Sequence, residues 1–167
     1  MGYIQLTVLK FFLFAIALTL NGSLSAETNS TRSRGPNGSG VAADETGVPP
    51  KFGPQENVVW RTELTPGNSS PVFGEDSISL TGYEGDPLFT YSMDRETGRI
   101  KWRRELKRNR SGQLCEPNSP ASPSPVTDVQ NVCVFFQDIG LLGYGHDGNE
   151  LWRIPVGPFN NPMGLAA

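Results

Sequence analysis

Short stretches of alternating apolar and polar residues, separated by turn sequences, fill the chain after residue 57. Residues 77–83 place Ile78 and Leu80 on one face, which is typical of a half-buried strand. Residues 132–136 are nearly all apolar, as expected for a strand covered on both faces. The other predicted strands are residues 87–94, 100–106, 141–146 and 150–156. No helical period follows the first 26 residues, so the pattern predicts an all-β chain.

Three tryptophans mark a repeat in this part of the chain. Trp60, Trp102 and Trp152 are each followed by an arginine, and they lie 42 and 50 residues apart. A unit of about 40–50 residues is typical of propeller blades and of other solenoids. Each unit has room for four short antiparallel strands joined by turns.

Two further landmarks recur in phase with the tryptophans. A Ser-Pro-Val triplet follows the first tryptophan at Ser70 and Pro71, and the second at Ser124 and Pro125. A glycine turn precedes the second and third tryptophans, formed by Asp94, Thr97 and Gly98 in one unit and by Asp147 and Gly148 in the next. The alternative fold is a β-sandwich with tryptophans in its core. Such a fold would not require the tryptophans, glycine turns and Ser-Pro-Val triplets to recur in the same order. We therefore predict two blades, residues 70–106 and 124–156, with residues 58–64 as the last strand of a preceding blade.

The N-terminal residues 1–26 are typical of a signal peptide. Lys10 precedes an apolar run, residues 11–20, and residues 23–26 are mostly small. The run is too short to span the roughly 30 Å hydrocarbon layer as a helix. We expect cleavage after Ser25 or Ala26, export to the periplasm or medium, and no membrane span in the mature chain.

Two segments outside the blades are predicted to be irregular. Residues 27–57 show neither the helical nor the strand periodicity of apolar residues, and they contain few large apolar side chains. We therefore expect them to form an extended arm. Within this arm, residues 34–40 are expected to dock on blade edges. Residues 107–123 lengthen the second unit, and we expect them to leave the surface as an insertion loop.

Composition and charge narrow the function classes. The chain has 19 glycines, 14 prolines and a net charge of −3, which fits a turn-rich fold and argues against a nucleic-acid partner. Residues 99–110 are basic, but their cationic side chains alternate with apolar ones along residues 100–106. This alternation indicates a solvated strand face.

Candidate catalytic and metal-binding residues are few. His146 is the single histidine, and no nucleophile elbow accompanies it, so a solvated turn histidine is expected. Four acidic residues could suggest a calcium site, but they lack the spacing of a calcium-binding loop. They are Asp128, Asp138, Asp147 and Glu150. We therefore predict neither catalytic residues nor a metal site.

The two cysteines, Cys115 and Cys133, are too few and too far apart for a metal cluster. In an exported protein they could form a disulfide. Alternatively, Cys133 is simply packed within its apolar strand. Both alternatives remain open at this point.

The repeat resembles the pyrroloquinoline-quinone-type (PQQ-like) β-propeller repeat, a WD40-like unit of quinoprotein dehydrogenases and of exported bacterial propellers without the quinone. The resemblance lies in Asp94-x-x-Thr97-Gly98-x-Ile100-x-Trp102 and in Asp147-Gly148-x-x-Leu151-Trp152. Residues 34–40 resemble the opening element of the exported group, so the likeness covers residues 34–167. It implies an all-β partial propeller of about two four-stranded blades plus one leading strand.

The resemblance implies two alternative functions. The first is a non-catalytic scaffold that binds proteins in the cell envelope. The second is a fragment of a quinone-dependent dehydrogenase, which would require the quinone and calcium; the cysteines here are not adjacent, unlike the pair often found in those enzymes. Because propellers close with about 4–8 blades, two blades leave bare faces, which are expected to bind partners or to self-associate.

Overall fold

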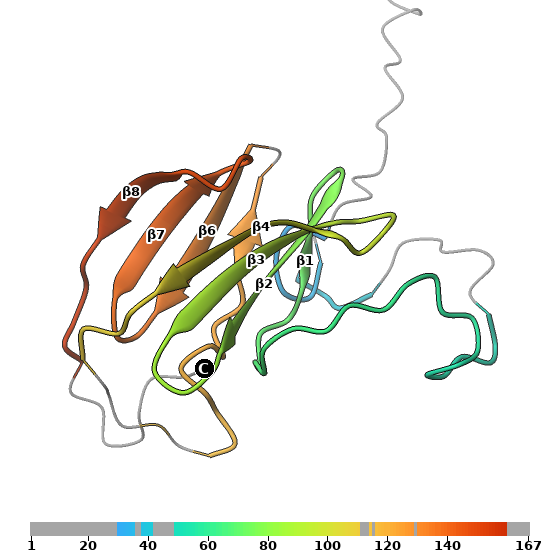
Figure 1. The fold of residues 1–167 in the computed structure, drawn as a ribbon, viewed down its shortest axis with the longest axis horizontal. Helices are drawn as coiled ribbons and strands as arrows, with labels where there is room; N and C mark the ends of the chain where they lie inside the picture. Colours follow the sequence, from blue (N-terminus) through green and yellow to red (C-terminus); the bar gives the residue numbers. More distant parts are fainter. Residues whose placement is uncertain are drawn as a thin grey trace, which may run out of the picture.

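The computed structural model describes residues 30–35, 38–41, 49–110, 114, 116–128 and 130–159. Within these residues the chain is all-β and forms two four-stranded antiparallel sheets that lie side by side (Figure 1). The predicted fold class, an all-β chain consistent with a partial β-propeller, is confirmed. The described part has no helix long and apolar enough to cross a membrane.

Both sheets are simple meanders in which sequence neighbours pair. The first sheet consists of β1 (Val72–Phe73), β2 (Ser77–Tyr83), β3 (Leu88–Asp94) and β4 (Ile100–Leu106). The second sheet consists of β5 (Val126–Thr127), β6 (Asn131–Phe136), β7 (Gly140–Gly145) and β8 (Glu150–Ile154). Each sheet begins at its Ser-Pro-Val triplet, as the repeat predicts.

The two sheets have the same register. In the first sheet Trp102 of β4 pairs with Ser92 of β3, and a bulge follows Ser92. In the second sheet Trp152 of β8 pairs with Gly143 of β7, and a bulge follows Gly143. The sequence repeat is therefore also a repeat in three dimensions.

The main hydrophobic core lies between the two sheets. The first sheet contributes Leu88 and Trp102, and the second contributes side chains from β6 and β7. These second-sheet residues are Val132, Val134, Phe136, Leu142 and Tyr144. The Trp102 and Tyr144 rings pack with their centroids 5.7 Å apart. Burial of these large side chains, each worth about 1.5–3 kcal/mol, holds the sheets together.

The predicted leading strand differs from the structure. Residues 58–64 belong to neither sheet, although they run alongside the first one. A β-strand requires a hydrogen-bonded neighbour. The described residues before residue 58 contain no other strand that could pair with this segment. Sequence alternation alone could not reveal that the described residues contain no strand to pair with it.

The arm contacts the sheets, but not through the expected residues. The carbonyl of Ser30 accepts a hydrogen bond from the Phe73 N–H of β1, and that of Thr31 accepts one from the Thr127 N–H of β5, each 2.8 Å long. The described part of residues 34–40 instead forms turns on itself, with Gly40 donating to Arg34. The arm therefore bridges the innermost strands of both sheets.

The insertion is not simply a surface loop. Ala121 is fully buried in the core between the sheets, and its carbonyl accepts a hydrogen bond from the Thr81 hydroxyl at 2.9 Å. Ser119 is also buried. At the start of the insertion, Arg108 forms a 2.7 Å ion pair with the buried Asp138. Small side chains let this segment enter the space between the sheets, which its polar composition did not suggest.

Two predictions fall outside the described residues. The signal peptide, residues 1–26, is one of them. The other is the disulfide, because Cys115 is not described, while Cys133 has a free thiol in the structure. Both stay predictions.

Candidate functional site

Trp102 sits on the glycine turn of the second sheet. Its indole N–H donates a 2.9 Å hydrogen bond to the carbonyl of His146. Gly148 has a φ of +78°, and a β-carbon at this position would lie 2.7 Å from the Trp102 ring. Arg104, two residues after the tryptophan, donates to the carbonyl of Gly148. Glycine is thus needed here both for its backbone conformation and for the close approach of the ring.

Trp60 makes the same set of contacts with the first sheet. Its indole N–H donates a 3.1 Å hydrogen bond to the carbonyl of Arg95. Thr62, again two residues after the tryptophan, donates to the carbonyl of Gly98 at 2.6 Å. A β-carbon on Gly98, whose φ is +70°, would clash with the Trp60 ring. Residues 58–64 therefore occupy the position of an outer strand without being part of a sheet.

Each glycine turn is closed by the aspartate that precedes it. The Asp94 carboxylate accepts hydrogen bonds from the Thr97 N–H at 2.8 Å and from the Thr97 hydroxyl at 2.6 Å. These bonds hold the pKa of Asp94 below its usual value, the hydroxyl contributing most. In the second sheet, Asp147 accepts from the Asn149 N–H at 2.9 Å. The aspartates have a structural role, because they present the carbonyls that the tryptophans bind.

Trp152 occupies the equivalent position on the second sheet, but no turn from the described residues lies above it. Its side chain is 42% exposed, whereas Trp102 is 8% exposed. All five residues of β8 are exposed, and Figure 1 shows this strand at the outer edge of the second sheet. Ile154 on the same face is also exposed, and Phe159 packs edge-on against Phe135 beside it. We call this surface, formed by Cys133, Phe135, Leu141, Trp152 and Ile154, the outer face.

The outer face differs chemically from the face of the first sheet that the second sheet covers. The covered face carries small polar side chains in equivalent register positions, namely Ser79, Thr81, Thr90 and Ser92. The outer face has Cys133, Phe135, Leu141 and Gly143 in their place. It is therefore more apolar than the covered face of the first sheet, and a protein that covered it would need a different complementary surface.

The two Ser-Pro-Val triplets meet at the inner edges of the sheets. The hydroxyl of Ser124 accepts a 2.8 Å hydrogen bond from the Ser70 N–H. Val72 and Pro125 are fully buried beside this contact. The serine of the triplet thus links one unit to the next, which explains why its position recurs.

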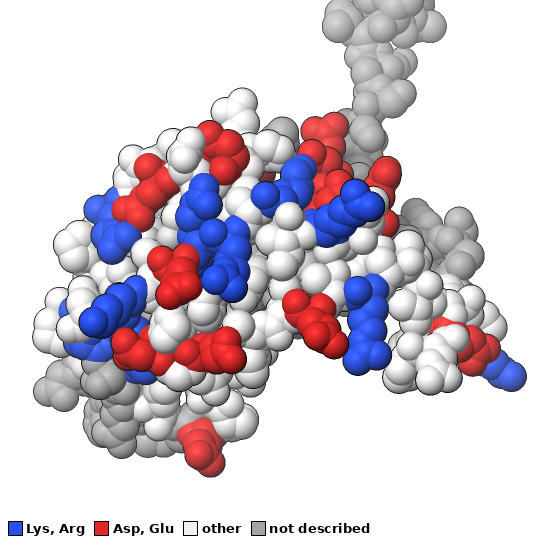
Figure 2. All heavy atoms as spheres, in the orientation of Figure 1, with Lys and Arg blue, Asp and Glu red and all other residues white. Residues whose placement is uncertain are grey.

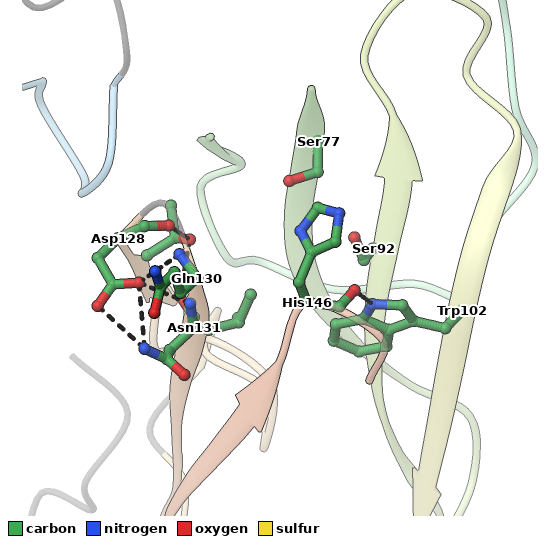
Figure 3. A pocket seen from close by; sticks show the side chains of 9 residues that line it. Ser77, Ser92, Trp102, Asp128, Gln130, Asn131 and His146 are labelled. Atoms are coloured by element: carbon green, nitrogen blue, oxygen red, sulfur yellow. Dashed lines mark hydrogen bonds between the residues drawn. The ribbon is translucent and has the colours of Figure 1, made fainter. Parts of the chain in front are cut away.

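His146 lies at the mouth of a narrow crevice between the sheets (Figure 3). Its side chain is about half exposed, and its Nε2 lies 3.7 Å from Asp76, which Lys101 also contacts at 2.7 Å. Lys101 lowers the pKa of Asp76. Ser77 and Ser92 line the same crevice, so serine, histidine and aspartate meet here. Neither serine forms a hydrogen bond with His146 in the described structure, however, and a nucleophile–base pair requires that contact.

The residues present do not fit the calcium and quinone of the dehydrogenase alternative. Each acidic candidate has a structural partner: Asp128 caps its own turn, Asp138 binds Arg108, and Glu150 binds Arg153. Among the described residues, no group of three or more His, Cys, Asp or Glu side chains could hold a metal. A surface hollow beside the first sheet is lined by four carboxylates and Arg95, which would repel a quinone that itself carries carboxylates. We derive no chemistry through these groups.

Charged side chains of both signs share the surface of the sheets. Figure 2 shows basic and acidic side chains interspersed over the visible face. Several of the basic residues of β4 and the insertion bind carboxylates or carbonyls of the chain itself, as Lys101, Arg104 and Arg108 do. Lys101 and Arg103 of β4 are nevertheless exposed on either side of the buried Trp102, as expected for a solvated strand face.

Some residues of the docking geometry were not singled out from the sequence. Thr62 and Arg104 bind the turn carbonyls, but they differ in type and so do not stand out as a repeat. Their common position, two residues after each tryptophan, was the available signal. The arm contacts of Ser30 and Thr31 use backbone carbonyls, which leave no signature in the sequence.

Comparison with known proteins finds no protein-family model that matches this chain and no match among curated proteins. The functional argument therefore rests on the docking of the tryptophans, the uncovered outer face and the crevice between the sheets.

Proposed function

We propose that this chain is part of an exported β-propeller of the PQQ-like type and that it serves as a non-catalytic scaffold for protein binding in the cell envelope. The observation that carries the proposal is the unequal covering of three equivalent tryptophans. Two of them sit on a glycine turn of the following sheet, while Trp152 is exposed in the same orientation on its sheet.

The partner in this proposal is a chain that presents a β-sheet to the outer face. Trp152 and Ile154 offer an apolar surface, and the indole N–H can donate to a turn carbonyl, as it does for Trp60 and Trp102. An exposed apolar sheet face beside a free edge strand favours association. The contacts of Trp60 and Trp102 thus indicate the surface that would fit, namely a sheet that presents a glycine turn to Trp152.

Light scattering on the purified chain tests the proposal, with a second copy as the available sheet-bearing partner. We expect the wild-type chain to associate in a concentration-dependent way and Trp152→Asp to remain monomeric. Val59→Asp is the control, because Val59 is 87% exposed and lies outside both sheets, away from the outer face. This control should associate like the wild type.

Two results would overturn the proposal. One is a wild-type chain that stays monomeric and melts cooperatively at every concentration. The other is oxidation of alcohols or sugars with a dye acceptor, after incubation with quinone and calcium, above a heat-inactivated control. That activity would support the dehydrogenase alternative instead.

A further inference from the structure

Residues 58–64 cover the first sheet as a single extended segment. Trp60 and Thr62 are partly buried and the residues beside them are exposed, so one side of the segment faces the sheet. These two side chains bind the turn carbonyls of Arg95 and Gly98. Within the described residues, no backbone–backbone hydrogen bond joins the segment to a strand. We call residues 58–64 the cap, because side chains hold it in place without strand pairing.

Beneath the cap, the first sheet has an apolar face. Three of its side chains are paired or neighbouring across β2 and β3, and they are Ile78, Tyr91 and Met93. Their equivalents in the second sheet belong to the core between the sheets, and they are Val132, Leu142 and Tyr144. The three first-sheet residues are at most 5% exposed, and the Tyr91 hydroxyl lies 2.9 Å from that of Thr65, directly after the cap. A single segment thus covers a face whose counterpart packs against a whole sheet.

Polarity at one position distinguishes the two sheets that a second copy could place on the outer face. Burial raises the pKa of Tyr144, and the neighbouring Thr90 side chain opposes part of this rise, so these two polar groups lie together between the sheets. The outer face has Leu141 in the position of Thr90, and the first sheet has Met93 in the position of Tyr144. A first sheet would therefore place Met93 near Leu141, both apolar, whereas a second sheet would bury the Tyr144 hydroxyl against an apolar side chain.

The glycine turn beneath the cap is also the turn that a first sheet would offer to Trp152. Trp60 occupies this turn in the structure, and Trp152 has the equivalent place on its own sheet. We infer that the outer face binds the first sheet of a second copy head to tail, and that the cap competes with Trp152 for the Gly98 turn. The inference rests on the proposed function, because it names the partner of the outer face.

The cap can leave its place without disrupting the sheet beneath it. Just after the cap, the Pro66 carbonyl accepts a 2.8 Å hydrogen bond from the Tyr83 N–H, and the Ser69 hydroxyl bonds to the backbone of Thr81. These contacts anchor the chain to β2, and the four strands pair with one another without the cap. Only molecules with an open cap can bind, so the apparent affinity falls in proportion to their fraction. Contacts that hold the cap closed therefore oppose association.

Fluorescence anisotropy of labelled wild-type chain, titrated with two unlabelled variants, tests the inference. Trp152→Asp keeps the cap but lacks a working outer face, and the double variant Trp60→Ala/Trp152→Asp also lacks the tryptophan that closes the cap. Neither variant can use its own outer face, so each offers only its first sheet. We expect the double variant to bind the labelled wild type at least about tenfold more tightly than Trp152→Asp does. Labelled Trp152→Asp is the control and should bind neither.

A milder variant keeps the test decisive if the loss of Trp60 unfolds the chain. Thr62→Ala/Trp152→Asp removes one hydrogen bond to Gly98 and retains the Trp60 ring, so it should also bind more tightly than Trp152→Asp, by a smaller factor. Equal affinities for all variants, alongside wild-type self-association that Trp152→Asp abolishes, would overturn the inference and leave the scaffold proposal standing. No association in any pairing, the wild type with itself included, would overturn both.

Discussion

The outer strands β4 and β8 have the same register and the same tryptophan, yet their surroundings are opposite. Trp102 of β4 is covered by the glycine turn of the second sheet and hydrogen-bonds to it. Trp152 of β8 lies over Gly143 of its own sheet and is exposed on the other side. The difference lies in what covers each strand, because the local pairing is equal.

This comparison separates local structure from assembly. Four antiparallel strands form in both units, so a sheet of this kind does not require a neighbour on its outer face. Burial of the tryptophan does require one. The repeat therefore encodes a sheet together with a docking position, and within the described residues a following sheet covers this position at Trp102 but not at Trp152.

The largest expected effect comes from removing the covered tryptophan. Trp102→Ala should lower the free energy of unfolding by about 3–5 kcal/mol, because it leaves a cavity between the sheets. Trp152→Ala, the matched substitution on β8, should lower it by less than about 1 kcal/mol. Chemical denaturation of both variants measures the difference. Equal losses would show that the two strands are covered alike in solution.

The glycine under the covered tryptophan should be the next most sensitive position. Gly148→Ala forces an alanine into a left-handed conformation, which costs about 1–2 kcal/mol, and adds a clash with Trp102 worth about 1–3 kcal/mol more. Gly85→Ala is the control, since Gly85 has a φ of +65° but nothing within 4 Å of a β-carbon. Denaturation midpoints of the two variants should differ in this order. A Gly85 variant as unstable as the Gly148 variant would mean that backbone strain alone matters.

The contacts of the arm should make a smaller contribution to the docking of the sheets. A chain that begins at residue 32 lacks the Ser30 and Thr31 carbonyls, each of which accepts one hydrogen bond worth about 1 kcal/mol. Hydrogen exchange should then become faster at the amides of Phe73 and Thr127. A chain that begins at residue 30 is the control. Unchanged exchange at both amides would contradict the bridging role of the arm.

The smallest expected effect is the pH dependence of the turn under Trp60. The folded-state pKa of Asp94 is below its usual value of 3.8, so this carboxylate stabilises the fold above that pH. The contribution should fall as the pH drops from 3.8 toward the folded-state pKa. Asp94→Asn should therefore be less stable than the wild type at neutral pH, and the gap should narrow in acid. A gap that is independent of pH would assign the effect to geometry instead of charge.

Most of the strands could be predicted because their signal is local. Residues 77–83 and 100–106 were predicted as strands, and they are β2 and β4 with the same bounds. Glycine turns bounded these segments, and the side-chain alternation within them has the period of a strand. The recurrence of the tryptophan, the glycine turn and the Ser-Pro-Val triplet in the same order also indicated correctly that the two units share one structure.

Only the tertiary structure decided which of the repeated elements are paired and which are covered. Residues 58–64 have the sequence pattern of a strand, but they pair with no other strand in the described structure. A local pattern cannot specify whether a hydrogen-bonding partner strand is present. Ala121 entered the core because space remained there for a small side chain, and Ser30 and Thr31 bind through backbone groups that every residue carries. The sequence by itself determined the all-β units and their landmarks, since these depend on near neighbours along the chain. Docking depends on contacts between distant segments, and so Trp102 and Trp152 look alike in the sequence and differ in the fold.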